Sequence, residues 1–457
     1  MKTITKCIPL ACLSISFLQA QEKGYTNFSD TTFNIQEVVA TAHYKARPQI
    51  TKLDVPMTYL PISVNSIQAS SLELRGIRDM QDAARFMPGI RIQTSYGAFQ
   101  QISVRGFDHA VMMVDGVRDE RSAINNSYPI GDLSSVESIE LLKGPASVLY
   151  GHSAVGGILN VVRKSPSERP TVNARLSYGS YENKQATIGM GGRLAGPVNY
   201  YANVNYADQE GWRSNGNRRF SGYLALQARL GAQDVIDVRG GFNRDFYGTE
   251  IGLPDLMSND VYSASDDKLY LKKNDMLPGL DREARYNTES DFRKNHGWNV
   301  RGPSTHTGDN GAKLMDRLSF TSDDINYFGT ESLDYLESDD AIYDHYYMKN
   351  GKKRYICLDT VYLSFPLRFS HIAKTVSNTL ELSGKTSTGD VRHNYMGGWA
   401  LVAMNRTSYS GYNLGEDVQG PGLYSHVSVY DPHSMGYMTT RFSKATPTTP
   451  TASTRRT

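Results

Sequence analysis

ISVRGFDHAVMMVDGVRDERSAINNSYPIGDLSSVESIELLKGPASVLYGHSAVGGILNVVRK, residues 102–164, is the stretch that decides the fold. Turns rich in Gly, Pro, Asp and Asn join its short β-type runs, which lie at residues 102–104, 111–114, 138–143 and 158–162. The pair Asp115-Gly116 predicts a type I′ hairpin turn, because both central residues of that turn need a positive φ. The stretch therefore predicts a small α/β unit with many loops.

Four motifs in this stretch occur in an order and spacing typical of one known family. They are ISVRGF (102–107), VDG (114–116), VESIELLKGPASVLYG (136–151) and GGILNVVRK (156–164). Together they resemble the plug domain of TonB-dependent outer-membrane receptors of the ferric-siderophore type. The resemblance implies an α/β plug followed by an antiparallel transmembrane β-barrel that surrounds it.

The amino-terminal sequence predicts export. Residues 1–20 carry Lys2 and Lys6, a short apolar segment and then Ala20, which is the pattern of a secretory signal peptide. Cys7 and Cys12 lie in this segment, so Cys357 would be alone in the mature chain, without a disulfide or a zinc-ligand cluster. With 49 Lys plus Arg against 47 Asp plus Glu, the charge gives no attraction to nucleic acid.

Residues 21–52 read as a flexible leader that contains one β-prone heptad, QEVVATA, at 36–42. The heptad resembles the TonB box, through which receptors of this family add a strand to the periplasmic energy-transducing protein. An ordinary edge strand is the other interpretation. The residues expected to form the box are Glu37, Val38, Val39, Ala40, Thr41 and Ala42.

After Pro170 the hydrophobic pattern changes to strict alternation. Each run is close to the ~10 residues of a tilted membrane strand, and Asn, Arg and Gln repeatedly fill the second face. A polar second face favours a barrel wall around water over a soluble sandwich with a dry core. The runs lie at residues 171–178, 185–194, 198–207, 220–230 and 235–246, and further ones are expected near 313–321, 355–371, 376–384, 391–403 and 423–429.

The barrel is expected to be incomplete. The family barrel has ~22 strands, which at roughly 15 residues per strand need ~330 residues, whereas only about 270 lie at 171–440. Residues 444–457, KATPTTPTASTRRT, are rich in Thr and Pro and do not resemble the family's terminal strand. The expected organisation is a signal peptide (1–20), a leader with the TonB box (21–52), the plug (53–166), a partial barrel (167–443) and a low-complexity tail (444–457).

Nothing in the sequence predicts an enzyme or a metal site. Asp108 and His109 are adjacent residues in a turn, and such neighbours rarely position side chains for catalysis. The glycine-rich run at 143–157 lacks the Gly-Lys-Ser/Thr ending of a phosphate-binding loop. No cofactor is expected, since iron would be carried only within the bound chelate.

The resemblance instead implies binding residues at the loop tips of the plug, where aromatic faces, Tyr hydroxyls and Arg suit a polar or anionic iron chelate. The expected ligand-binding residues are Tyr96, Phe99, Gln100, Arg121 and Tyr128. It also implies that Arg105 and Lys143 hold the plug by pairing with acidic residues of the wall, some of which would lie on missing strands.

The expected function is TonB-dependent uptake of a ferric siderophore across the Gram-negative outer membrane, in a truncated form. The expected partners are a TonB-type protein, the ferric siderophore and outer-membrane lipid. Receptors for haem, cobalamin or an oligosaccharide, and a truncated product that does not transport, remain open. A secreted soluble β-sandwich is a further alternative.

Overall fold

In the computed structural model, the amino-terminal part of the chain forms two small sheets and two short helices. One sheet has the order β1 (Ser63–Gln68), β7 (Val136–Lys143), β8 (Gly157–Arg163), β5 (Val111–Val114) and β6 (Val117–Arg118), with β5 and β8 parallel. The other consists of β2 (Ile90–Ser95), β3 (Phe99–Val104) and β4 (Phe107–Asp108). The helices are α2 (Ala69–Leu74) and α3 (Met80–Ala84).

The structure describes residues 50, 62–95, 99–108, 110–120, 132–144, 150, 154–254, 257–288, 291–412, 426–432 and 453–456. Pro48–Thr457 form one compact unit. Among the described residues, no helix is long and apolar enough to cross a membrane.

The predicted β runs of the plug are confirmed. All four residues of β5 are buried, as expected for a central strand that is covered on both faces. Asp115 and Gly116 have φ values of 52° and 74°, which confirms the predicted turn between β5 and β6. Asp79 caps the amino terminus of α3, since its carboxylate accepts a hydrogen bond from the Asp82 amide at 2.8 Å, and the helix buries Met80 and Ala83.

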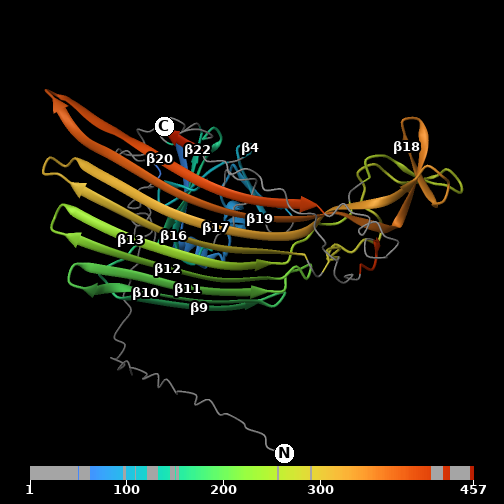
Figure 1. Cartoon of the computed structure of the whole chain (residues 1–457), viewed down its shortest axis with the longest axis horizontal. Helices are drawn as coiled ribbons and strands as arrows, with labels where there is room; N and C mark the ends of the chain where they lie inside the picture. The colour runs from blue at the N-terminus through green and yellow to red at the C-terminus, as the bar shows by residue number, and fades with distance from the viewer. Residues whose placement is uncertain are drawn as a thin grey trace, which may run out of the picture. The chain divides into compact units, whose positions relative to one another are not determined.

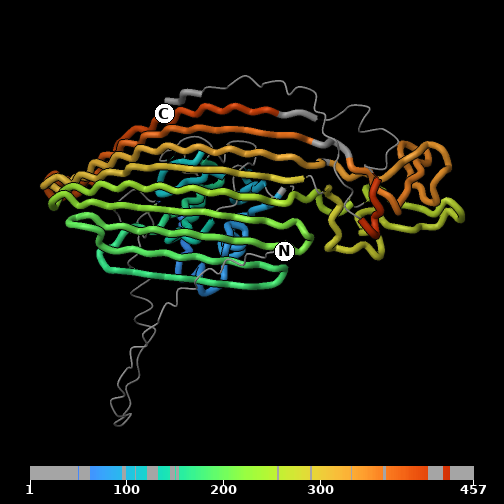
Figure 2. The backbone as a smooth tube through the Cα atoms, turned by 60° about the horizontal axis from the view of Figure 1, so that its bottom comes forward, coloured from blue at the N-terminus to red at the C-terminus, as the bar shows by residue number. Residues whose placement is uncertain are grey.

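Long antiparallel strands form a single large sheet after residue 170 (Figures 1 and 2). All five of the first predicted runs are confirmed, with each observed strand extending a few residues beyond the predicted run. The long strands are β9 (Thr171–Gly179), β10 (Asn183–Ala195), β11 (Val198–Gln209), β12 (Asn217–Leu230), β13 (Asp234–Tyr247), β16 (Phe292–Thr307), β17 (Lys313–Ser338), β19 (Lys352–Thr388) and β20 (Val391–Tyr412).

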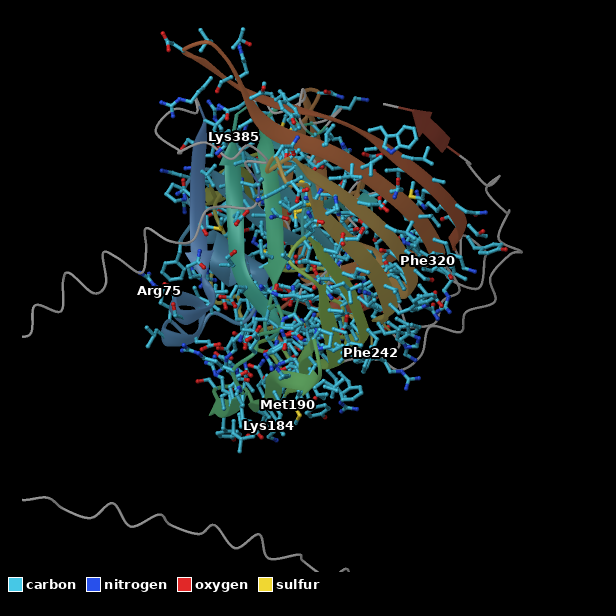
Figure 3. All side chains as sticks on the ribbon, turned by 90° about the vertical axis from the view of Figure 1, so that its left-hand side faces the viewer. Arg75, Lys184, Met190, Phe242, Phe320 and Lys385 are labelled. Carbon is cyan, nitrogen blue, oxygen red and sulfur yellow. The ribbon has the colours of Figure 1, made fainter. Side chains whose placement is uncertain are left out.

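The two faces of this sheet have inverted polarity. Leu224 is 48% exposed and Phe242 is 45% exposed, whereas Asn203 on the opposite face is 3% exposed. Met190, Phe242 and Phe320 lie on the convex side of the sheet (Figure 3). An apolar face that is open to the surroundings and a polar face that is covered are typical of a membrane wall rather than of a soluble sandwich.

The connections at the two ends of the strands differ in length. At one end the turns are short, as at residues 196–197, 231–233, 308–312 and 389–390. At the other end, β13 and β16 are separated by residues 248–291, which include β14 (Val261–Ser263) and β15 (Leu269–Leu271). These strands join β18 (His345–Lys349) and the distal part of β19 in a lobe with its own apolar cluster around Val261 and Ile356.

The sheet is not closed in the part of the chain that the structure describes. There, β9 pairs only with β10, and no pairing joins it to β20.

Two differences from the predicted wall are clear: β16 was not predicted, and the runs predicted at 355–371 and 376–384 are one continuous strand, β19. In the tail, β22 (Ser453–Arg456) pairs with β20, where the sequence predicts no strand.

Candidate functional site

The candidate site is the interface between the plug and the polar face of the wall. Of the predicted ligand-binding residues, Phe99 and Gln100 are described. Tyr96, Arg121 and Tyr128 lie outside the described residues, as do the signal peptide and the TonB box residues Glu37, Val38, Val39, Ala40, Thr41 and Ala42.

Phe99 inserts between wall side chains. Its ring contacts the ring of Tyr327 edge-on, with centroids 5.1 Å apart, and the Arg293 guanidinium lies 4.4 Å from the Phe99 centroid. Both wall residues are at most 1% exposed. A desolvated cation over an aromatic face is a favourable contact, so the β2–β3 hairpin is held at this position on the wall.

Buried amide groups without partners accompany this contact. Gln100 is 2% exposed, and its Oε1 has no hydrogen-bond partner among the described residues. The same holds for both amide atoms of Asn295, which lies on the same face of β16 as Arg293. Buried polar groups of this kind are costly, and water or a polar ligand would satisfy them.

A second contact is a charge cluster at the β5–β6 turn. One Asp115 oxygen lies 3.5 Å from the Arg239 guanidinium and the other lies 3.7 Å from that of Arg301. The Arg163 amide of the plug donates to Asp115 at 2.8 Å. The side chains of Asp115, Arg239 and Arg301 are 8%, 12% and 5% exposed, so the cluster is a buried ion pair between plug and wall.

Hydrogen bonds other than ion pairs complete the interface. The Ser221 hydroxyl of the wall donates to Asp132 at 2.5 Å, and the Ser134 hydroxyl of the plug donates to Asn203 at 2.9 Å. Arg78 donates to the Asn183 amide oxygen at 2.7 Å. An interface of polar pairs, unlike an apolar core, can separate and be rehydrated without exposing hydrophobic surface.

Arg105 and Lys143, which were predicted to lock the plug, lie at the edge of the plug sheets. Arg105 is exposed with a φ of 55°, and Lys143 ends β7. Among the described residues neither forms an ion pair with the wall, so their role stays a prediction. The observed pair has the opposite polarity, with the acid on the plug. Sequence reasoning missed it because Asp115 was already explained by the turn.

A cavity of about 350 Å³ lies between the α2–α3 side of the plug and strands β9 and β10. Among the described residues that line it, Arg78, Lys164 and Arg175 are basic and Glu73 is acidic. Lys164 pairs with Glu73 at 3.3 Å. The excess of positive charge makes the cavity better suited to anions than to cations.

The described residues show no cluster of three His, Cys, Asp or Glu side chains that could hold a metal ion.

Tyr150 of the plug donates its hydroxyl to the backbone oxygen of Ile50, and burial raises the pKa of this hydroxyl above its ordinary value. Tyr150 therefore remains a neutral hydrogen-bond donor at physiological pH.

Comparison with known proteins agrees with this arrangement. Residues 56–158 match the family described as TonB-dependent Receptor Plug Domain. An iron-regulated outer membrane virulence protein of Vibrio cholerae is 32% identical over 134 residues, which is 27% of this chain and 20% of that protein. The ferrioxamine B receptor of Salmonella typhimurium is 26% identical over 295 residues, 60% of this chain and 40% of the receptor.

Solved structures show the same fold. The ferric-catecholate import receptor of E. coli K12 superposes with a TM-score of 0.67 at 18% identity, covering 86% of this chain and 55% of the receptor. The ferripyoverdine receptor of the Pseudomonas aeruginosa outer membrane superposes with a TM-score of 0.66 at 17% identity, covering 88% of this chain and 49% of the receptor. The chain thus spans about half the length of these structures. Residues 56–158 therefore resemble a TonB-dependent receptor plug, and the relatives reported above include proteins named as outer-membrane proteins.

Proposed function

We propose that the chain provides the leader, the plug and the first part of the wall of a TonB-dependent receptor that takes up a ferric siderophore across the outer membrane. The observation that carries the proposal is the plug itself, which is docked by buried polar contacts on the polar face of a sheet whose other face is apolar. A transporter of this kind needs a plug that closes the barrel firmly and can still move when the ligand passes.

The mechanism involves binding and movement, without covalent chemistry. Phe99 and Gln100 would meet the chelate from the outer side, together with Tyr96, Arg121 and Tyr128. Residues 37–42 would pair with a TonB-type protein in the periplasm, and tension on the leader would shift the plug. Iron is cargo in this scheme, so the receptor needs no cofactor of its own.

Two observations favour an anionic chelate as the ligand. Arg293 is buried beside Phe99, and the cavity beside β9 and β10 is lined by Arg78, Lys164 and Arg175. Guanidinium groups bind catecholate and carboxylate oxygens through charge-assisted hydrogen bonds, and aromatic rings pack against the flat ligand groups. The alternative ligands are haem, cobalamin and an oligosaccharide, which other receptors with this kind of plug would take up.

A second candidate is a form that binds but does not transport. It is favoured by the edge of β9 that has no partner strand within the described part of the chain, since an unpaired strand edge is unstable within a lipid bilayer. In that case the plug and the partial wall would bind a chelate without conducting it.

The test is growth under iron limitation with a panel of ferric chelates. The wild-type chain is compared with a variant in which Val38 and Val39 are both replaced by Pro, which removes two backbone donors from the strand that TonB would pair. We expect growth on one chelate class and its loss in the variant, with a Thr31→Pro, Thr32→Pro variant in the leader as the matched control. Undiminished uptake by the Val38, Val39 variant would refute the coupling, and chelate binding without any uptake would favour the second candidate.

A further inference from the structure

The leader enters the plug at Ile50. The Ile50 side chain is 1% exposed and belongs to a cluster with Val111, Met113 and Leu142. Its amide donates to the Glu140 carboxylate at 3.0 Å, and its carbonyl oxygen accepts from the Tyr150 hydroxyl. Only seven residues separate Ile50 from Ala42, the last residue of the predicted TonB box, so tension on the box reaches Ile50 early.

Glu140 connects Ile50 to the central strand of the plug. Glu140 is 2% exposed on β7, and the same carboxylate oxygen that accepts from Ile50 also accepts from the Asn160 amide at 3.1 Å. A buried carboxylate depends on such donors, because each lost hydrogen bond leaves its charge less solvated. Removal of Ile50 therefore weakens the position of Glu140 and its contact with Asn160.

Asn160 continues the connection to the turn that holds the plug on the wall. Asn160 is fully buried on β8, and its Oδ1 accepts from the Gly116 amide at 3.1 Å. Gly116 follows Asp115, whose carboxylate faces Arg239 and Arg301 of the wall. Asp and Gly both accept the positive φ of this turn, so the Asn160 bond is not needed to form the turn and instead fixes its position relative to β8.

We propose that Ile50, Glu140, Asn160 and Gly116 form a hydrogen-bonded relay that couples withdrawal of the leader to release of the Asp115 ion pairs with the wall. Glu140 and Asn160 are positioning residues in this relay. The proposal rests on the proposed function, and it adds the route by which tension at the leader loosens the plug. The first two connections, Ile50 to Glu140 and Glu140 to Asn160, are hydrogen bonds between buried groups, and the third, Asn160 to Gly116, is partly buried. Water has little access to the first two bonds, so loss of the Ile50 bond is transmitted towards the turn.

The test is hydrogen–deuterium exchange of the full chain in detergent micelles, read at the Gly116 amide. Ile50→Ala, Tyr150→Phe and Glu140→Gln each weaken the start of the relay. We expect the Gly116 amide to exchange roughly tenfold faster or more in the Glu140→Gln variant, the size of effect that loss of a charged hydrogen bond produces. The Ala83 amide in α3, which bonds to the Asp79 carbonyl, should be unchanged.

Two matched controls separate a relay from general loosening. Leu72→Ala truncates another buried plug residue in a different cluster, and Glu73→Gln neutralises a plug acid outside the relay. Neither variant should increase the exchange rate of the Gly116 amide more than that of the Ala83 amide. In an Asn160→Leu background, which removes the acceptor of Gly116, Ile50→Ala should have no further effect at Gly116.

Exchange that rises equally at Gly116 and Ala83, or that leaves Gly116 unchanged in all three relay variants, overturns the proposal. Tyr150→Phe keeps the packing of the ring, so this variant remains informative if Ile50→Ala does not fold. The exchange measurement needs no transport. A failed relay is therefore distinguishable from a failed uptake function, which only the growth assay reports.

Discussion

Replacement of Asp115 by Asn should release the plug from the wall more easily. Asn tolerates the φ of 52° at this position, and its side-chain oxygen can still accept from the Arg163 amide, so the variant changes charge with little change in shape. What it removes is the attraction to Arg239 and Arg301 at 3.5 and 3.7 Å. The two guanidinium groups would then face each other without the carboxylate between them.

The size of the effect follows from distance and burial. At 3.5 Å and an effective dielectric constant of about 20, one such pair attracts by about 5 kcal/mol before desolvation is counted. Breaking a buried pair costs about 3–5 kcal/mol in measured cases. Both distances here exceed the ~2.8 Å of an ideal charged hydrogen bond. We therefore expect Asp115→Asn to destabilise the docked plug by about 3 kcal/mol, the lower end of this range.

The assay is pulse proteolysis of the full chain in detergent along a urea gradient, with trypsin cleaving plugs that have left the wall. With an m-value of roughly 1.5 kcal/mol/M, the midpoint should fall by about 2 M. The matched control is Glu120→Gln, a plug acid that pairs with Arg118 inside the plug at 2.8 Å. A midpoint that moves by less than a few tenths of 1 M, or that moves equally in the control, would show that the Asp115 cluster does not hold the plug.

Three further outcomes are expected. Phe99→Ala removes the ring beneath Arg293 and should weaken binding of an anionic ferric chelate about tenfold in a titration, whereas unchanged affinity would place the ligand elsewhere. Leu224→Arg on the apolar face should lower recovery in the membrane fraction, at a cost of about 2–4 kcal/mol, while Gln185→Arg on the polar face should not; equal recovery of the two would contradict the assignment of faces. Burial raises the pKa of Tyr286 to about 12 in the lobe, where its hydroxyl donates to the Val429 carbonyl at 2.5 Å. A raised pKa means that the folded chain holds this proton more tightly than the unfolded chain, so its stabilisation is complete below about pH 10 and is lost as the pH rises towards 12; because other tyrosines titrate in the same range, an alkaline titration followed by tyrosinate absorbance should show a smaller late rise in Tyr286→Phe than in the wild-type chain, and identical curves would contradict the assignment.

Much of the wall could be predicted because its strands alternate strictly. In β11, Asn199, Asn203 and Asn205 are buried on one face, while Val204 and Tyr206 are exposed on the other, as the period of two requires. β16 escaped prediction because Gly297, Gly302 and Pro303 interrupt its apolar pattern. Only the pairing of β16 with β13 and β17 identifies it as a strand, and pairing is not a local property of sequence.

The site was less predictable than the fold. The motifs located the plug, and the resemblance placed Phe99 at a loop tip, but neither indicated that Arg293 would lie over the Phe99 ring. Asp115 and Arg239 are far apart in the sequence, and each has a sufficient local explanation, one as a turn residue and the other as a residue of the polar face. Their pairing depends on the docking of two domains, which no single motif encodes.

The unequal lengths of the wall strands have a practical consequence for the intact cell. β17 has 26 residues and β19 has 37, whereas β9 has 9. Only ~10 residues are needed to cross the bilayer, and β17 pairs with β16 only as far as Phe328, so at ~3.3 Å per residue the remaining residues, 329–338, continue for about 33 Å past the end of β16. The turn at Asn350 and Gly351 would then stand well above the lipid surface. An antibody epitope inserted there should be readable on living bacteria without disturbing the part of the chain embedded in lipid.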